Sequence, residues 1–335
     1  MLKITVTVCT YNRVILLEQV LTALQDQTIS HSEYEIIICD SKSCDGTEKL
    51  IKQISEFSPV SITHVNTKNN LAAKRNIGIQ SAAAPLIVFL DDDCVPERDF
   101  LERYLKTFSH VLPTDKVVYC GEVRYPQQWV KESNYYRFRD SRHYMVSKDD
   151  KYNKKLNYKT IVVMNMCFRA EIFKNIIGNV DESFIGYGAE DQELGHRLEQ
   201  NGFSIMTNSA RIYHFENTGT IEAYGDKIRR SSRDGMRTLM RVAPDAAFGI
   251  DTLRKIDRDF PNRSIFDFAF SFFIRLILMS NTHIAICHFL SKADRKKIFY
   301  IPILYRFVMA VFYLEGSLQR SNSIDEKQAE KGWDQ

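Results

Sequence analysis

The chain lacks most of the features that mark specialised classes of protein. Its seven cysteines are odd in number and form no CxxC pair, which argues against a disulfide framework and a zinc site, so we expect reduced thiols in the cytoplasm. The start, MLKITVTVCTYNR, turns polar too early for a signal peptide. Neither of the two most apolar segments, 265–279 and 298–314, reaches the ~20 uninterrupted apolar residues of a membrane-spanning helix.

The net charge of +3 is too small to suggest a nucleic-acid partner. The charge is nevertheless uneven. Residues 226–306 hold 16 Lys and Arg against 8 Asp and Glu, whereas residues 1–225 hold 26 against 29. A basic segment behind a near-neutral region indicates an anionic surface or substrate near the C-terminal part of the chain. The 44% of hydrophobic residues is typical of a globular protein with a sizeable core.

Short apolar runs alternate with helical patterns at the start of the chain. Strands are predicted at 4–9, 34–39, 60–65 and 85–90, and helices at 14–24, 47–57 and 71–83. This alternation predicts an α/β fold with βαβ units and a parallel sheet, whose ligands bind at the carboxyl ends of the strands.

Polar loops directly follow three of the predicted strands, at 10–13, 40–45 and 91–93. All three loops are therefore expected to open onto one crevice. Asp91, Asp92 and Asp93 are adjacent carboxylates that repel one another, so a positive group is expected beside them. The alternative, a solvated acidic turn, does not explain why two further polar loops share its edge.

Six segments of this chain resemble, in order and spacing, the inverting glycosyltransferases of family 2. They are VTVCTYNR, IIICDSKSCDGT, NNLAAKRNIGIQSAAAPLIVFLDDDCVP, NMCFRAEIF, DESFIGYGAEDQELGHRL and IYHFE, and together they cover roughly residues 3–217. The resemblance implies the GT-A fold, a Rossmann-like, mixed and mostly parallel sheet flanked by helices. It also implies sugar transfer from a nucleotide-diphosphate donor with inversion at the anomeric carbon.

The triple aspartate resembles the DxD motif of that family, which holds Mn²⁺ or Mg²⁺ against the diphosphate of the donor. The resemblance implies Asp93 and Asp91 as metal ligands. It also implies a ligand role for His214, although a lone histidine is often a structural residue.

The donor nucleotide is expected to contact the three loops and the predicted 71–83 helix. The residues implied are Thr10, Tyr11, Asn12, Arg13, Asp40, Arg75, Asn76, Asp91 and Asp92. A carboxylate such as Asp40 suits the imide of uracil, which favours a UDP-linked donor, although the second loop departs from the family pattern DDGSxDGT. Lys74 is expected on a solvated helix face.

The Glu190-Asp191 pair follows a glycine-rich turn and resembles the acceptor-binding and base carboxylates of the family. The resemblance implies Asp191 as the general base and Glu190 as an acceptor-positioning group. Acidic residues also suit a helix start, which is the structural alternative. A sugar or acceptor pocket is implied at Asn165, Met166, Gly188 and Trp129, with a core position as the alternative for Met166. Trp129 lies in the region 121–158, where aromatic and arginine side chains alternate.

Segment 265–279 carries Asp267, Ser271 and Arg275 at intervals of four, which puts its polar residues in one narrow stripe of a helix. With the basic residues nearby, this favours an interfacial helix on an anionic membrane, at the inner face of the cytoplasmic membrane. Packing on the catalytic domain, or on another subunit in a homo-oligomer, is the alternative.

The expected organisation is a GT-A domain at 1–225, a helical segment at 226–318 and a polar tail at 319–335. The GT-A domain divides into a nucleotide-sugar half at about 1–120 and an acceptor half at about 121–225.

The expected function is metal-dependent sugar transfer to a glycan or to a polyprenyl- or lipid-linked acceptor, in polysaccharide or glycoconjugate synthesis. A sugar-nucleotide nucleotidyltransferase is one alternative, but it would show a glycine-rich loop where this chain has residues 10–13. A non-catalytic sugar-nucleotide-binding or assembly subunit is another, and would not hydrolyse the donor.

Overall fold

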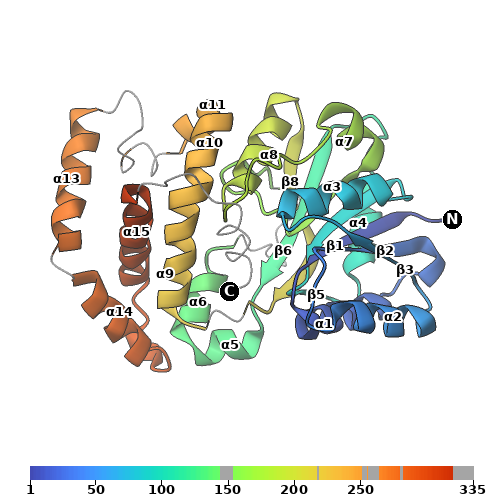
Figure 1. The fold of residues 1–335 in the computed structure, drawn as a ribbon, viewed down its shortest axis with the longest axis horizontal. Helices are drawn as coiled ribbons and strands as arrows, with labels where there is room; N and C mark the ends of the chain where they lie inside the picture. The colour runs from blue at the N-terminus through green and yellow to red at the C-terminus, as the bar shows by residue number, and fades with distance from the viewer. Residues whose placement is uncertain (144–153, 217–218, 251–254, 256–263, 280–281, 320–335) are drawn as a thin grey trace.

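A mixed β-sheet forms the centre of the molecule (Figure 1). The computed structural model describes residues 1–143, 154–216, 219–250, 255, 264–279 and 282–319. Within these residues the sheet has eight strands in the order β3-β2-β1-β4-β7-β6-β8-β5. They are β1 (Ile4–Thr10), β2 (Tyr34–Asp40), β3 (Ser61–Asn66), β4 (Leu86–Asp91), β5 (Cys94–Pro96), β6 (Val117–Arg124), β7 (Asn165–Arg169) and β8 (Ser204–His214).

The first four strands are parallel and correspond to the four predicted from the sequence. β1 is buried along its whole length because it lies between β2 and β4. In the register of these strands, Cys9 pairs with Asp91 and Thr10 with Asp40. The three predicted polar loops therefore leave the sheet at the same edge, as the α/β fold requires.

Helices cover both faces of the sheet, and further helices pack beside the sheet and form a second half of the molecule. They are α1 (Val14–Gln25), η1 (His31–Glu33), α2 (Thr47–Phe57), α3 (Leu71–Ser81), α4 (Phe100–Phe108), α5 (Gln127–Glu132), α6 (Asn134–Asp140), α7 (Ala170–Ile176), α8 (Glu190–Gln200), α9 (Ile221–Arg230), η2 (Ser231–Gly235), α10 (Met236–Val242), α11 (Pro244–Phe248), α13 (Ile265–Met279), α14 (Thr282–Lys292), η3 (Lys297–Phe299) and α15 (Pro302–Leu318). The apolar side chains of α1, α2 and α4 form one core with the sheet, and those of α3, α7 and α8 form another on the opposite face.

The C-terminal helices pack beside the sheet around a third core, to which α6, α9, α14 and α15 contribute. Gly225 of α9 lets α15 approach closely, because a Cβ atom there would lie 2.2 Å from a ring carbon of Phe312. The expected domain boundary at residue 225 falls inside α9. This helix therefore belongs to both halves of the molecule.

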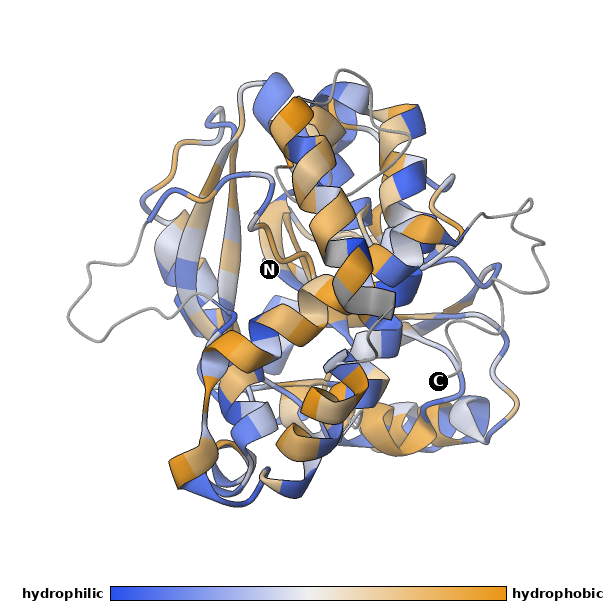
Figure 2. Ribbon diagram, turned by 90° about the vertical axis from the view of Figure 1, so that its left-hand side faces the viewer, coloured by the Kyte–Doolittle hydropathy of each residue, from blue (hydrophilic) through white to orange (hydrophobic). Residues whose placement is uncertain are grey.

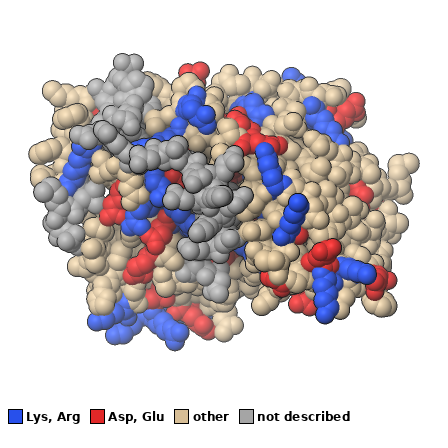
Figure 3. Space-filling view, viewed as in Figure 1, with Lys and Arg blue, Asp and Glu red and all other residues tan. Residues whose placement is uncertain are grey.

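The outer surface of the C-terminal helices has a distinct character. Figure 2, which faces the side that lies on the left in Figure 1, shows hydrophobic residues along α13 and α14. Figure 3 shows Lys and Arg side chains gathered at the lower left, where α14 ends in Figure 1. Among the described helices, none has both the length and the apolar character needed to cross a membrane.

Candidate active site

A polar cavity opens at the carboxyl ends of β1 and β4. It is lined by Cys9, Thr10, Tyr11, Arg13, Leu71, Lys74, Asp91, Asp92, Asp93, Met164, Tyr187, His214, Glu216, Lys227 and Arg230. These residues come from loops of the parallel sheet, from α3, from the segments before β7 and α8, from the end of β8 and from α9. Two of the three predicted loops, 10–13 and 91–93, thus line one cavity, whereas the loop at 40–45 contributes no lining residue. Helix α9 closes one side of the cavity.

Two β-strands bring His214 to the aspartates. β5 follows the aspartates directly and pairs antiparallel with β8, so that Cys94 lies opposite His214. The backbone N–H of Phe215 donates to the carbonyl of Asp93 at 2.7 Å. As a result, His214 Nε2 lies 3.4 Å from Asp93 Oδ2, although the two residues are far apart in the sequence.

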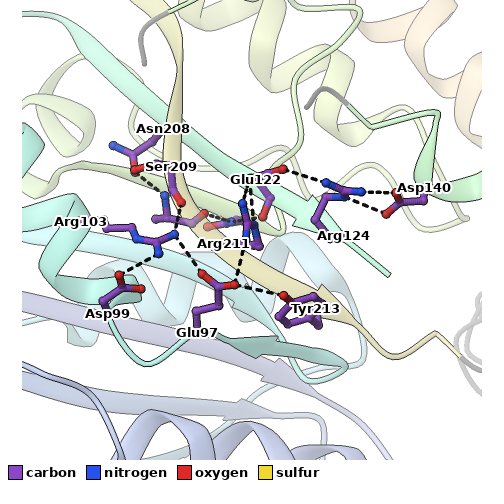
Figure 4. Close-up of polar contacts among 12 residues, drawn as sticks. Glu97, Asp99, Arg103, Glu122, Arg124, Asp140, Asn208, Ser209, Arg211 and Tyr213 are labelled. Atoms are coloured by element: carbon purple, nitrogen blue, oxygen red, sulfur yellow. Dashed lines mark hydrogen bonds and ion pairs between the residues drawn. The ribbon is translucent and has the colours of Figure 1, made fainter. Parts of the chain in front are cut away.

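An ion-pair network fixes the strands behind this junction (Figure 4). Arg211 of β8 contacts Glu97 at 3.1 Å and Glu122 of β6 at 2.9 Å. The hydroxyl of Tyr213 also donates to Glu97 at 3.1 Å. Because Glu97 immediately follows β5, these contacts hold the end of β8, and with it His214, against the aspartate turn.

The positive group expected beside the three aspartates is Arg13. Its Nη1 lies 3.1 Å from both Asp92 Oδ1 and Asp93 Oδ2. Burial raises the pKa of Asp92 to about 6 in spite of this cation. Burial also opposes the charge of Asp93, but His214 and Arg13 hold the pKa of Asp93 well below its usual range. One carboxylate of the cluster is therefore firmly ionised.

The donor atoms around Asp93 fit a divalent cation. Among the described residues, the buried atoms Asp91 Oδ1 and His214 Nδ1 have no hydrogen-bond partner. The possible ligand atoms of Asp93, Cys94 and His214 lie within 4.8 Å of one another. Burial raises the pKa of the Cys94 thiol well above the ordinary value, which keeps this thiol protonated. Carboxylate oxygens with one imidazole suit Mn²⁺ or Mg²⁺ better than a soft, thiolate-bound metal.

Arg75 connects the aspartate cluster to a second pair of carboxylates. The buried guanidinium lies 3.7 Å from Asp91 and 3.5 Å from Asp191 at the start of α8. Asp191 also accepts a hydrogen bond from the backbone N–H of Val163 at 3.2 Å. Burial and the charge of Asp191 raise the pKa of Glu190 to about 7, and burial also raises the pKa of Asp191. Arg75 therefore lies between two acidic centres. One is the aspartate cluster, in which the pKa of Asp93 is lowered, and the other is the Glu190-Asp191 pair, in which both pKa values are raised.

The wall that α9 contributes is cationic. Lys227 and Arg230 lie three residues apart, hence on the same helix face, and both line the cavity. Their charged groups lie 5.9 and 6.0 Å from the ring centre of Tyr187. Lys227 forms an ion pair with Glu216, which also accepts a 2.7 Å bond from Arg139. This wall was not predicted, and the local excess of basic residues was the only sign of it in the sequence.

Comparison with known families decides the classification. The model of glycosyl transferase family 2 matches residues 5–177, more than half of the 335-residue chain. The chain belongs to glycosyl transferase family 2. A second model, described as the N-terminal domain of galactosyltransferase, matches residues 142–219.

Individual relatives of this family-2 chain are distant. It is 26% identical over 225 residues to the validoxylamine A glucosyltransferase of Streptomyces hygroscopicus subsp. jinggangensis, a match that covers 61% of this chain and 53% of that protein. The chain spans between 35% and 53% of the length of the curated relatives that match it best.

Two solved structures share the fold at 16% sequence identity and a TM-score of 0.51. The structure of S. aureus TarS 1–349 in complex with UDP is matched over 94% of this chain and 90% of that chain. The mannosyltransferase PcManGT from Pyrobaculum calidifontis, in complex with GDP-Man and Mn²⁺, is matched over 92% and 85%. These likenesses show that the family-2 chain has the GT-A fold.

One expectation for an individual residue of the family-2 chain is wrong, that for Lys74, and the pocket role of Asn165 and Met166 stays a prediction. Lys74 is buried and lines the cavity, 5.5 Å from the ring centre of Tyr11, because α3 packs this face against the first loop rather than leaving it in solvent. Asn165 and Met166 are fully buried in the sheet as the first residues of β7, so neither lines the cavity. Met164, immediately before β7, lines it instead.

Four predicted donor residues lie outside the cavity lining, namely Asn12, Asp40, Asn76 and Arg75, whose contacts are given above. Asn12 joins the first two loops through bonds to Ser43 and Cys44, both at 2.8 Å. The carboxylate of Asp40 accepts bonds from Ser43, the shortest at 2.6 Å. Asn76 is buried and exchanges bonds with the backbone of Val180. In this structure these side chains brace the loops around the cavity.

Four further predicted residues, Gly188, Trp129, Glu190 and Asp191, also lie outside the lining. Gly188 has a φ of +94°, and a Cβ atom there would lie 2.2 Å from Ser231 Oγ, so this glycine permits close packing on η2. Trp129 of α5 packs against Tyr136 and Phe215, with ring centres 4.9 and 5.4 Å away. Phe215 follows His214, which places Trp129 behind the aspartate cluster.

Proposed function

We propose that this chain is a metal-dependent, inverting glycosyltransferase that uses a nucleotide-diphosphate sugar. The observation that carries the proposal is the pairing of two acidic centres across Arg75. One is the aspartate cluster with His214, whose donor atoms fit a divalent cation, and the other is the Glu190-Asp191 pair. An inverting transfer needs one centre that stabilises the leaving diphosphate and a second that takes the proton of the acceptor hydroxyl. The two centres must be separate, since the leaving group and the incoming hydroxyl occupy opposite sides of the sugar.

In this proposal Asp91, Asp93 and His214 hold Mn²⁺ or Mg²⁺. The bound cation would neutralise charge that develops on the diphosphate as it leaves. Arg13 balances two of the aspartates, so that the cluster keeps its negative charges together in a buried place. Tyr11 and Thr10 contribute further lining on the donor side.

The Glu190-Asp191 pair would take the proton of the acceptor. The acceptor oxygen forms a bond to the anomeric carbon while the bond to the diphosphate oxygen breaks, and that oxygen keeps the electron pair. We assign the base role to Asp191, because Arg75 and the N–H of Val163 orient its carboxylate. Glu190 has a buried oxygen without a hydrogen-bond partner among the described residues, which suits it to an acceptor hydroxyl.

The cations of α9 extend the donor site in this proposal. A leaving nucleoside diphosphate carries more negative charge than one divalent ion neutralises. Arg13, which pairs with Asp92, lines the cavity together with Lys227, which pairs with Glu216, and Arg230. We assign Lys227 and Arg230 to the diphosphate.

The two solved relatives are described with different nucleotides. TarS is described in complex with UDP and PcManGT in complex with GDP-Man, so these relatives do not select one base. We propose UDP-linked donors first. For the acceptor we propose a glycan or a lipid-linked saccharide, met at an anionic membrane surface during polysaccharide or glycoconjugate synthesis. Residues 1–225 and 226–318 would serve as the catalytic and membrane-facing parts, with α9 shared between them.

A thermal-shift panel of UDP-, GDP-, CMP- and dTDP-sugars, each with and without Mn²⁺, tests the proposal. A ligand that binds only the native state stabilises it by RT ln(1 + [L]/Kd). We expect a metal-dependent shift with one nucleotide class, followed by slow hydrolysis of that donor. No shift with any sugar nucleotide and metal would contradict the proposal. Binding without hydrolysis or transfer would instead identify a non-catalytic binding subunit.

A further inference from the structure

Helix α13 carries its apolar residues outward and its polar residues inward. Its large apolar side chains are exposed, among them Ile265, Phe266, Phe268, Phe270, Phe272, Phe273 and Leu276. Phe266 is 82% exposed, whereas Asp267 and Ser271 are only 8% and 3% exposed. A helix on an aqueous surface has the opposite arrangement, so the outer face of α13 is built for a non-aqueous neighbour.

The packing of α13 explains its orientation. The helix contacts α14 and α15, and its narrow polar stripe is turned toward the protein. Asp267 caps the helix start, since its carboxylate accepts a 2.7 Å bond from Ser264 Oγ. In Figure 2, hydrophobic residues continue from α13 along α14.

A basic region adjoins this apolar surface. The turn between α14 and α15 exposes Lys292, Arg295, Lys296 and Lys297, and α15 adds Arg306. Exposed apolar side chains stand among them, namely Ile298, Phe299 and Ile303. The acidic residue in the turn, Asp294, accepts a 2.7 Å bond from the backbone N–H of Tyr135. The turn therefore combines positive charge with apolar side chains, as membrane-surface segments do.

We propose that the outer faces of α13, α14 and the η3 turn form a docking surface for an anionic lipid bilayer. A second copy of the chain is the main competitor for such a surface. A two-fold dimer through this surface, however, would bring the basic turns of both copies into one interface, which adds repulsion between like charges. Anionic headgroups supply the opposite charge, and the acyl boundary accepts the phenylalanines. The proposal rests on the proposed function only in that a lipid-linked acceptor would be met there.

Vesicle co-sedimentation of the full chain tests the docking surface. Neutral phosphatidylcholine vesicles are compared with vesicles that also contain phosphatidylglycerol, at low and high salt, without donor or acceptor. We expect binding on the order of tenfold tighter to the anionic vesicles, and weaker at high salt because the charges are exposed. Equal binding to both vesicle types would overturn the proposal. Because no sugar nucleotide is present, a failure here is separate from a failure of the transferase assignment.

Two double variants test which residues of the docking surface bind the vesicles. Phe268→Ser with Phe272→Ser removes exposed apolar side chains, and Lys296→Glu with Lys297→Glu reverses the basic turn. Each is expected to lose vesicle binding by about tenfold or more while keeping the donor-induced thermal shift. Phe57→Ser and Lys49→Glu with Lys52→Glu, at exposed positions of α2, are the matched controls and should bind like the wild type.

Two results would reject the bilayer as the occupant. One is vesicle binding that is unchanged both in Phe268→Ser with Phe272→Ser and in Lys296→Glu with Lys297→Glu. The other is a dimer in analytical ultracentrifugation that dissociates when Phe268 and Phe272 are replaced, which would identify a second copy of the chain.

Discussion

At the scale of single residues, Asp93 is the carboxylate of the aspartate cluster whose ionised form is most strongly stabilised. Arg13 and His214 both contact it, and its pKa lies well below the ordinary range. We expect Asp93→Ala to abolish the metal-dependent part of donor binding and leave the fold intact, because Arg13 retains Asp92. Calorimetric titration of UDP with and without Mn²⁺ measures this. Asp26→Ala, at an exposed position, is the control. Wild-type affinity for donor with Mn²⁺ in folded Asp93→Ala would sink the metal assignment.

Asp191 carries the proposed base role. An acceptor hydroxyl is a poor nucleophile at neutral pH, and removing a general base lowers the chemical step by about 10²–10⁴-fold. Asp191→Asn should lose turnover by that order and keep donor affinity, since Arg75 separates this carboxylate from the aspartate cluster. Turnover near the wild-type rate would show the assignment to be wrong. So would a product with retained anomeric configuration, determined by NMR.

The carboxylate pair also predicts a pH dependence. Burial raises the pKa of both groups, that of Glu190 to about 7, and a base acts only when ionised. Lowering the pH therefore protonates the pair and removes activity, so kcat/KM should rise with pH and level off above about 7. In Glu190→Gln the remaining carboxylate titrates alone, and the rise should move to lower pH. A flat profile between pH 5 and 8, or an unmoved rise in Glu190→Gln, would contradict this prediction.

At the scale of secondary-structure elements, α9 offers a test with an internal control. Arg230 lines the cavity, whereas its neighbour Arg229 turns to α15 and contacts Glu315 at 2.6 Å. Replacing a charged contact to a diphosphate typically costs about 1.5–3 kcal/mol, or roughly ten- to a hundredfold in affinity. Arg230→Gln should lose that much affinity for the nucleoside diphosphate and much less for the monophosphate. Arg229→Gln removes a contact with α15 and not one with the ligand, so it should change the two affinities by the same factor. Equal losses for both nucleotides would remove Arg230 from the diphosphate site.

How far the sequence predicts this site depends on where each element begins. The loops after β1 and β4 were predicted because short apolar runs locate strand ends, and parallel strands share an edge. The places of Asn165 and Met166 outside the cavity lining also depend on where a strand begins. β7 begins at Asn165, so residues expected in a pocket are inside the sheet and Met164 is left at its edge. A shift of one or two residues decides between core and cavity, and motif spacing does not resolve it.

Charged residues of helices were predicted least well. Lys74 was expected in solvent, yet α3 buries Lys74, Arg75 and Asn76 together. A single sequence shows which side chains are charged but not which neighbours share their burial. The cavity wall formed by α9 was harder still to predict from the sequence. Lys227 contacts Glu216 and lines the cavity only because the C-terminal helices pack on the sheet domain. Long-range packing of this kind leaves no local pattern.

At the scale of the whole molecule, α9 makes the two halves mechanically dependent on each other. One face of the helix carries Lys227 and Arg230 into the cavity, and Gly225 packs directly on Phe312 of α15. The sheet domain and the C-terminal helices should therefore unfold together, in one transition seen alike by circular dichroism and calorimetry. Two separated transitions would mean that α9 does not couple them.

Gly225→Val tests this coupling directly. The added side chain would collide with the buried ring of Phe312, and overpacking of this kind costs about 1–3 kcal/mol. Because α9 must then shift away from α15, we expect the variant to lose both thermal stability and affinity for the donor diphosphate, although residue 225 does not line the cavity. Asp226→Val introduces the same β-branched side chain at the next, exposed position of the helix and serves as the control. It should lower stability by less and leave donor affinity unchanged. If Gly225→Val lowers stability but binds the diphosphate as the wild type does, α9 holds its cations in place without support from α15, and the two halves are independent in function.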